Sequence, residues 1–211
     1  SSILEKADIY KSLVILYAMS AKFQSAIVAG SEGLKLLDIQ VPRSNLQAAI
    51  DLEVSSIQQH LRDRDISSSI DLPLMNIPDK IAAVKILGAM DSAAYLLDDN
   101  LYHWVASKQV NIFFQYGNIA ESVKGYSDFG VATISILGDY QAAYQFGLLA
   151  LKLSDRFNDR AQKCKISIHN YWLNCWVKPL TSLDAFYWDG HNAGLISGEL
   201  LYAGYNLVYE I

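Results

Sequence analysis

The sequence has 211 residues, of which 52% are apolar and 18% are charged, and its formal net charge at pH 7 is -5. An apolar fraction of this size can fill a large core, so the composition excludes an intrinsically disordered chain. Because acidic and basic residues do not gather in blocks, the sequence carries no electrostatic footprint for nucleic acid or for an anionic membrane.

No apolar run approaches the ~20 residues that span a bilayer, and residues 1–30 lack a basic segment followed by a cleavage site. We therefore expect a cytoplasmic protein without a membrane partner. The charged fraction lies below the ~25% of typical soluble domains, which indicates that neighbouring structure covers part of the surface. Since the chain starts without Met and stops inside an apolar helical pattern, we expect a fragment of a longer protein.

Apolar residues recur at helical spacing along nearly the whole chain, and strand-like alternation is hard to find. Helix starts are predicted near residues 3, 22, 43, 78, 100, 119, 139, 160, 181 and 200. They recur about every twenty residues, the spacing that the antiparallel hairpins of a helical solenoid require. The one long gap contains residues 64–78, rich in Ser, Asp and Pro, which we interpret as an ordered loop or crossover.

Several turns share one pattern, in which a residue suited to the left-handed conformation precedes a good N-cap side chain. The pairs are Gly117-Asn118, Gly138-Asp139 and Asn158-Asp159. Two further starts resemble capping boxes, namely Ser44 with Gln47 and Thr181 with Asp184. The adjacent acids Asp98 and Asp99 are interpreted as the N-terminus of a helix and not as an acid–base pair.

Two segments resemble the tetratricopeptide repeat (TPR), "YAMSAKFQSAIVAGSEGLKL" and "GDYQAAYQFGLLALKL". Their aromatic and small packing positions are Tyr17, Phe23, Ala26, Gly30 and Gly33 in the first, and Gly138, Tyr140, Ala143, Gly147 and Ala150 in the second. Small residues let a neighbouring helix approach closely. The sequence therefore predicts an all-α fold, a TPR-like antiparallel helical-hairpin solenoid of about ten helices. We expect it to form a single domain over residues 1–211, with an irregular connection near 64–78.

The sequence lacks the motifs of nucleotide, dinucleotide and zinc sites, so we expect neither an enzyme nor a cofactor in this chain. Its four histidines lie on different predicted helices or turns, so we expect no metal site; they are His60, His103, His169 and His191. Cys164 and Cys175 share one predicted helix, which places their Cα atoms about 16 Å apart, too far for a disulfide.

Aromatic residues are dense in the last forty residues or so, and five of them are candidate binding residues for a protein partner or ligand. They are Trp172, Trp176, Trp188, Tyr202 and Tyr205. Two interpretations stay open. The rings fill a core and pack beneath a further repeat, or they line a concave groove that recognises a peptide or protein.

The order of the segments resembles the helical region of large bacterial hybrid sensor kinases. The segments that carry the resemblance are "LLDIQVP", "LPLMNIPDKIAA", "QVNIFFQYGNIAESVKGYSDFG", "LGDYQAAYQFGLLALKLSDRF", "KCKISIHNYWLNCWVKPL" and "GLISGELLYAGY". Such proteins carry a Ser/Thr-kinase-like domain, an AAA-type NTPase module, a TPR-like array, a GAF domain and a histidine kinase. One departure is Asp38, where the family more often turns on Gly.

The resemblance implies a non-catalytic regulatory module that contacts a protein partner or the adjacent domains of the parent kinase and gates its NTPase or kinase domain. One alternative is a sensor that binds a small molecule or peptide in an aromatic-lined pocket. A second is a spacer that forms weak homodimers through its exposed terminal faces.

Overall fold

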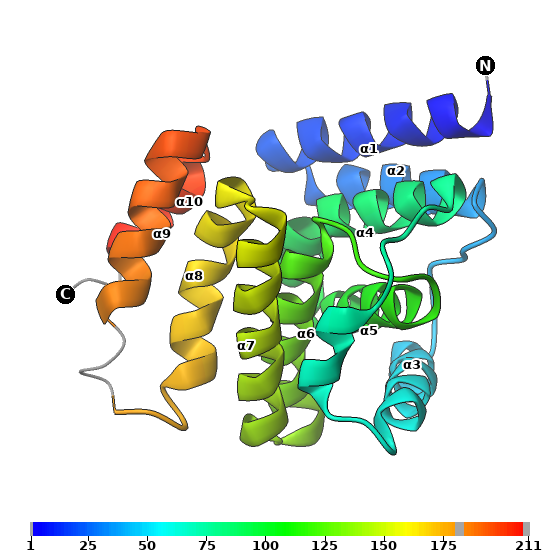
Figure 1. Cartoon of the computed structure of the whole chain (residues 1–211). Helices are drawn as coiled ribbons and strands as arrows, with labels where there is room; N and C mark the ends of the chain where they lie inside the picture. Colours follow the sequence, from blue (N-terminus) through cyan, green and yellow to red (C-terminus); the bar gives the residue numbers. More distant parts are fainter. Residues whose placement is uncertain (1, 180–183, 209–211) are drawn as a thin grey trace. The chain divides into compact units, whose positions relative to one another are not determined.

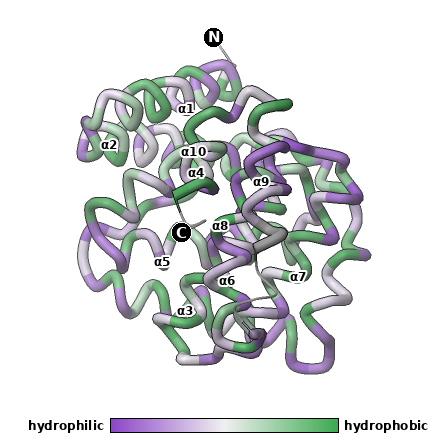
Figure 2. The backbone as a smooth tube through the Cα atoms, turned by 90° about the vertical axis from the view of Figure 1, so that its left-hand side faces the viewer, coloured by the Kyte–Doolittle hydropathy of each residue, from purple (hydrophilic) through white to green (hydrophobic). Residues whose placement is uncertain are grey.

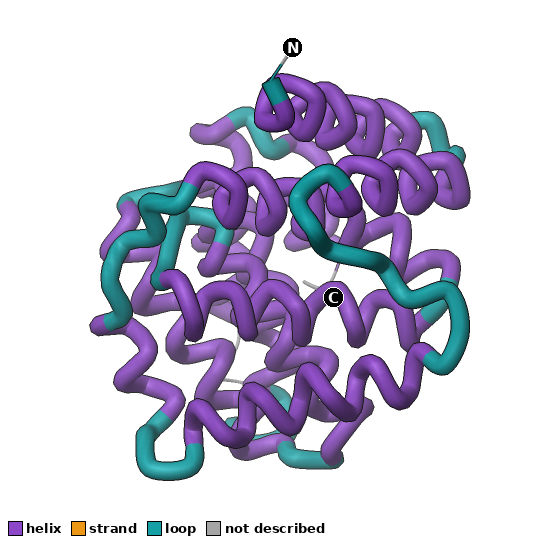
Figure 3. The backbone as a smooth tube through the Cα atoms, turned by 90° about the vertical axis from the view of Figure 1, so that its right-hand side faces the viewer, coloured by secondary structure: helices purple, strands orange, loops and turns teal. Residues whose placement is uncertain are grey.

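The computed structural model describes residues 2–179 and 184–208, and every regular element in these ranges is a helix (Figures 1 and 3). The helices are α1 (Ile3–Met19), α2 (Phe23–Lys35), α3 (Leu46–Leu61), the 3-10 helix η1 (Ile66–Asp71), α4 (Pro78–Leu97), α5 (Asp99–Tyr116), α6 (Ser122–Leu137), α7 (Tyr140–Phe157), α8 (Arg160–Asn174), α9 (Asp184–Ser197) and α10 (Leu200–Val208). Hydrophobic and hydrophilic stretches alternate along them (Figure 2). The predicted all-α helical-hairpin array is confirmed.

The chain divides into two compact units. Unit 1 comprises Ser1–Asp63 and Leu72–Ile119, which hold α1 to α5. Unit 2 comprises Arg64–Asp71 and Ala120–Ile211, which hold η1 and α6 to α10. The single domain expected over residues 1–211 stays a prediction.

In unit 1, α1 pairs with α2, and α4 packs on both of them and pairs with α5. The predicted role of the small residues is confirmed, since a Cβ at Gly30 would overlap the sulfur of Met90 on α4. A Cβ at Gly33 would lie 2.8 Å from Tyr10 Cβ on α1 and 3.0 Å from Ile86 Cδ1 on α4. Gly30 therefore allows α4 to pack closely on α2, and Gly33 allows both α1 and α4 to do so. Helix α3 packs on α5, so the hairpins do not stack strictly in chain order.

The connection before α4 is ordered, as predicted. In unit 2, η1 packs on α7, and Arg156 donates a hydrogen bond to the Ile70 carbonyl. In unit 1, the following segment forms a parallel bridge with Asn118, in which Asn118 N donates to Pro73 O (2.8 Å) and Met75 N donates to Asn118 O (2.9 Å).

This bridge overturns the capping role predicted for Gly117-Asn118. Gly117 has φ 101° and ψ 179°, outside the left-handed helical region, and Asn118 pairs with the loop at residues 73–75. Helix α6 begins only at Ser122, and its N-cap residue Glu121 makes no side-chain capping bond. A long-range backbone pairing has therefore replaced a local cap.

Most of the other predicted turns are confirmed. Gly138 is left-handed with φ 64°, and Asp139 accepts from Ala142 N at 2.8 Å. Asn158 is left-handed with φ 50°, and Asp159 accepts from the main chain of the first turn of α8. These two turns join α6 to α7 and α7 to α8.

At the start of α5, Asp98 is the N-cap and accepts from the main-chain N–H groups of Asn100 and Leu101, so the interpretation of the paired acids as a helix N-terminus is confirmed. The capping box of Ser44 and Gln47 is wrong. Asn45 is the N-cap residue, with φ 54° and no side-chain cap, and Gln47 donates instead to Asp51 (2.9 Å). The box of Thr181 with Asp184 lies outside the described residues.

In unit 2, α6 pairs with α7, α8 packs on both, and α9 packs on α8 and α10. A Cβ at Gly147 would lie 2.9 Å from Leu173 Cδ1, so this glycine brings α7 close to α8. Gly190 and Gly194 bring α9 close to α8 in the same way. A Cβ at Gly190 would overlap Ser167, and a Cβ at Gly194 would lie 2.6 Å from Cys164 Sγ.

Candidate interaction surface

The five predicted aromatic residues all lie in unit 2, and two of them are at the end of α8. Trp172 is half-buried, and its ring centroid lies 6.2 Å from that of His169, one turn earlier. Trp176 is exposed just after α8, and its ring centroid lies 5.1 Å from that of Tyr140, the first residue of α7. Trp176 therefore extends the contact of α7 with α8 to the protein surface.

The other three lie on α9 and α10. Trp188 is exposed on α9, 6.2 Å from His191, whose Nδ1 is 3.1 Å from the Ala203 carbonyl of α10. Tyr202 and Tyr205 are 5.8 Å apart in an edge-to-face arrangement on α10. The Lys165 amine of α8 lies 5.8 Å from the Tyr202 ring, in the range of a cation–π contact.

None of these ring pairs joins two of the five residues except Tyr202 with Tyr205, which are both on α10. Exposed aliphatic residues, which the aromatic-centred prediction missed, lie at the end of α9 and at the start of α10. We define the α9–α10 apolar surface as Leu195, Ile196, Leu200, Leu201 and Tyr205. Leu201 and Tyr205 are four residues apart and therefore share one face of α10. The helical spacing of apolar residues in this segment is the sequence feature that could have indicated the surface. Because nearly every helix of the chain shares this spacing, it does not single out these residues.

A buried polar cluster joins α6 to α8. The Lys124 amine lies 2.9 Å and 2.8 Å from the two carboxylate oxygens of Asp128. His169 Nδ1 lies 3.3 Å from Asp128 Oδ1 and 3.2 Å from Ser127 Oγ. A catalytic Ser–His–Asp triad contacts its serine and its aspartate through different ring nitrogens. The contacts of His169 with Asp128 and Ser127 both use the same ring nitrogen, and they link α8 to α6.

The remaining histidines are also held locally. The ring centroids of His60 and Phe114 lie 5.7 Å apart. Burial lowers the pKa of His103, although the negative charges of Asp99 and Asp98 act to raise it. Among the described residues, no three His, Cys, Asp or Glu side chains gather as a metal site would require.

Both cysteines are free, in agreement with the spacing argument. Burial raises the pKa of the Cys164 thiol to about 11, and Glu199 adds to that effect, whereas Lys165 and Asn206 oppose it. Burial also raises the pKa of Cys175.

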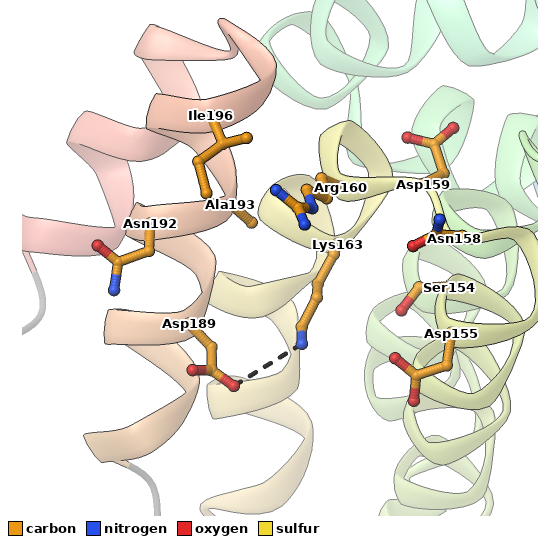
Figure 4. A pocket seen from close by; sticks show the side chains of 10 residues that line it. All are labelled: Ser154, Asp155, Asn158, Asp159, Arg160, Lys163, Asp189, Asn192, Ala193 and Ile196. Carbon is orange, nitrogen blue, oxygen red and sulfur yellow. Dashed lines mark ion pairs between the residues drawn. The ribbon is translucent and has the colours of Figure 1, made fainter.

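Unit 2 contains a polar cavity of 310 Å³ between the end of α7, the start of α8 and α9 (Figure 4). Its lining residues are Ser154, Asp155, Asn158, Asp159, Arg160, Lys163, Asp189, Asn192, Ala193 and Ile196. The Lys163 amine lies 3.7 Å from the Asp189 carboxylate, and Arg160 is a further cationic residue of the lining (Figure 4). Charges of both signs line this cavity, and none of the five predicted aromatic residues does.

Unit 1 contains a second cavity, of 410 Å³, with a more apolar lining. Its lining residues are Gln24, Ile27, Val28, Ser31, Glu32, Val41, Pro42, Arg43, Leu46 and Leu101. The aromatic candidates do not line this cavity either.

Comparison of the chain with protein-family models, with curated proteins and with solved structures found no match. Within residues 2–179 and 184–208, no helix is long and apolar enough to cross a membrane.

Proposed function

We propose that this chain is a cytoplasmic, non-catalytic interaction module that binds a protein or a neighbouring domain and thereby regulates a multidomain signalling kinase. The observation that supports binding is the α9–α10 apolar surface, where four aliphatic side chains at the end of α9 and the start of α10, and Tyr205 on α10, are exposed. Exposed apolar patches of this kind mark protein-binding sites, and tyrosines such as Tyr205 are enriched among the residues that dominate binding energy.

The placement within a kinase rests on the sequence resemblance alone. By analogy with other signalling NTPases that carry a helical array beside their motor, the partner proposed here is the NTPase module of the parent protein. The alternative of a sensor with an aromatic pocket has less support, because none of the five aromatic residues lines the cavity of unit 1 or the cavity of unit 2 described above.

The test is a calorimetric titration of the chain against that NTPase module, with and without ATP. We expect saturable binding whose affinity depends on the nucleotide. Leu201→Ser combined with Tyr205→Ser should weaken it at least tenfold, since both side chains belong to the α9–α10 apolar surface.

Leu52→Ser is the matched control, because Leu52 of α3 is 74% exposed and Leu201 is 63% exposed, so neither change opens a core cavity. It should leave the affinity unchanged. Absence of binding in every nucleotide state would refute the proposal. A concentrated sample that forms dimers in light scattering, and returns to monomers with Leu201→Ser, would favour the homodimer alternative instead.

A further inference from the structure

The apolar cavity of unit 1 lies between α2, the loop that follows it and the first turns of α3 and α5. Ile27 and Leu101 are the buried residues of its lining, and Val28, which is 54% exposed, lines it together with Pro42 and Leu46. This lining contains no aromatic side chain. The cavity therefore presents an aliphatic surface to whatever enters it.

The loop that lines the cavity is anchored at its start, next to α2. Leu37 and Ile39 are buried, and Ile39 N donates to Leu34 O (3.0 Å). Asp38 and Asn45 both adopt the left-handed conformation, with φ 60° and 54°, and reverse the chain on either side of the segment 41–43. The cavity wall is thus part of the folded structure of unit 1.

Two residues of opposite charge are among the lining residues, the half-buried Glu32 of α2 and the exposed Arg43 of the loop. Within the described part of the chain, neither side chain makes an ion pair or a side-chain hydrogen bond. The nearby Ser31 hydroxyl is already used, since it donates to Ile27 O (2.7 Å). The Glu32 carboxylate and the Arg43 guanidinium therefore have no side-chain partner among the described residues and can pair with the charged groups of a ligand.

We propose that this cavity binds a free aliphatic amino acid. The ligand carboxylate pairs with Arg43, its ammonium group pairs with Glu32, and its side chain packs on Ile27 and Leu101. Arginine suits a carboxylate because its planar donors can form two parallel hydrogen bonds. This site lies in unit 1, so it is separate from the surface on which the proposed partner binding depends.

The volume supports a small ligand over a helical peptide. One turn of α-helix, ~10 Å across and ~5.4 Å high, has about the volume of the whole cavity, so a helix of several turns does not fit. Small-molecule sites span ~300–1,000 Å³, and they combine an apolar lining with a few placed polar groups. The 410 Å³ cavity and its two charges match that description.

The test is calorimetric titration of the whole chain with L-leucine, and separately with N-acetyl-L-leucine and L-leucinamide. The first analogue lacks the ammonium charge and the second lacks the carboxylate. We expect saturable binding of L-leucine and at least tenfold weaker binding of both analogues, because each leaves one protein charge without its partner.

Substitutions then assign the two charges. Arg43→Gln should weaken L-leucine binding at least tenfold and abolish the preference for L-leucine over L-leucinamide. Glu32→Gln should abolish the preference over N-acetyl-L-leucine. Arg62→Gln is the control, since Arg62 is an exposed arginine at the end of α3 outside the cavity lining.

The proposal is overturned if L-leucine does not bind at millimolar concentration, or if both analogues bind as well as L-leucine. It is equally overturned if Arg43→Gln and Glu32→Gln leave the affinity unchanged while circular dichroism shows that both variants are folded. The Leu201→Ser and Tyr205→Ser changes should not affect L-leucine binding, so failure of the partner-binding proposal is distinguishable from failure of this one.

Discussion

Replacement of Gly117 by alanine should destabilise the protein far more than a typical turn substitution. Gly117 ends α5 with φ 101° and ψ 179°, a conformation that residues with a Cβ rarely adopt. An added Cβ would also overlap the Pro73 carbonyl oxygen and lie 3.2 Å from Met75 N. Because these are backbone atoms, no side-chain rotation can relieve the overlap.

The magnitude follows from two contributions. The backbone conformation costs an alanine ~1–3 kcal/mol. Moving the loop at residues 73–75 away disrupts the two hydrogen bonds of the bridge with Asn118, each worth ~0.5–1.5 kcal/mol. We therefore expect Gly117→Ala to lower the free energy of unfolding by about 2–6 kcal/mol.

Gly138→Ala is the matched comparison. Gly138 has φ 64°, and no atom lies within 4 Å of an added Cβ, so only the backbone term remains. Gly138→Ala should therefore lower the free energy of unfolding by about 1 kcal/mol. The assay is urea unfolding followed by circular dichroism, with the free energy taken from linear extrapolation. If Gly117→Ala proves no more destabilising than Gly138→Ala, the steric argument at the bridge is refuted.

Three further predictions concern caps and thiols. Asp139→Ala should lower the free energy of unfolding by about 1 kcal/mol in the same assay, because it removes the cap on Ala142 N; a neutral result would contradict that role. Ala21→Gly should raise the free energy of unfolding by up to about 1 kcal/mol, since Ala21 has φ 54°, and a loss of stability would count against it. At pH 8 a thiol reagent should modify Cys175 well before the buried Cys164, because the pKa of Cys164 is about 11 and its thiolate fraction is therefore very small. Mass spectrometry follows the two modifications, and equal rates would be inconsistent with the burial of Cys164.

The local features of the fold could be predicted from the sequence. Pro78 is the first residue of α4, and Asp139 and Asp159 cap α7 and α8 as expected. These signals succeed because a cap or a proline acts on backbone groups within one turn of itself.

Features that depend on distant partners could not be predicted. The local sequence of Gly117-Asn118 suits a cap, but Asn118 pairs with residues more than forty positions earlier. The aromatic candidates were selected by residue type, whereas exposure is set by which helices pack on which. The cavity of unit 1 could not be predicted from the sequence, because its lining combines residues of α2, the loop after it, α3 and α5.

The course of the chain between the two units determines how the protein can be cut into pieces. Residues 64–71 belong to unit 2, although they are flanked on both sides by segments of unit 1. A fragment that starts at residue 120 therefore lacks η1 and the Ile70 carbonyl to which Arg156 donates. A fragment that ends at residue 119 retains η1 without α7. Expression boundaries placed between α5 and α6 would thus leave both products incomplete, and a contiguous unit 2 requires a linker that rejoins residues 64–71 to residue 120.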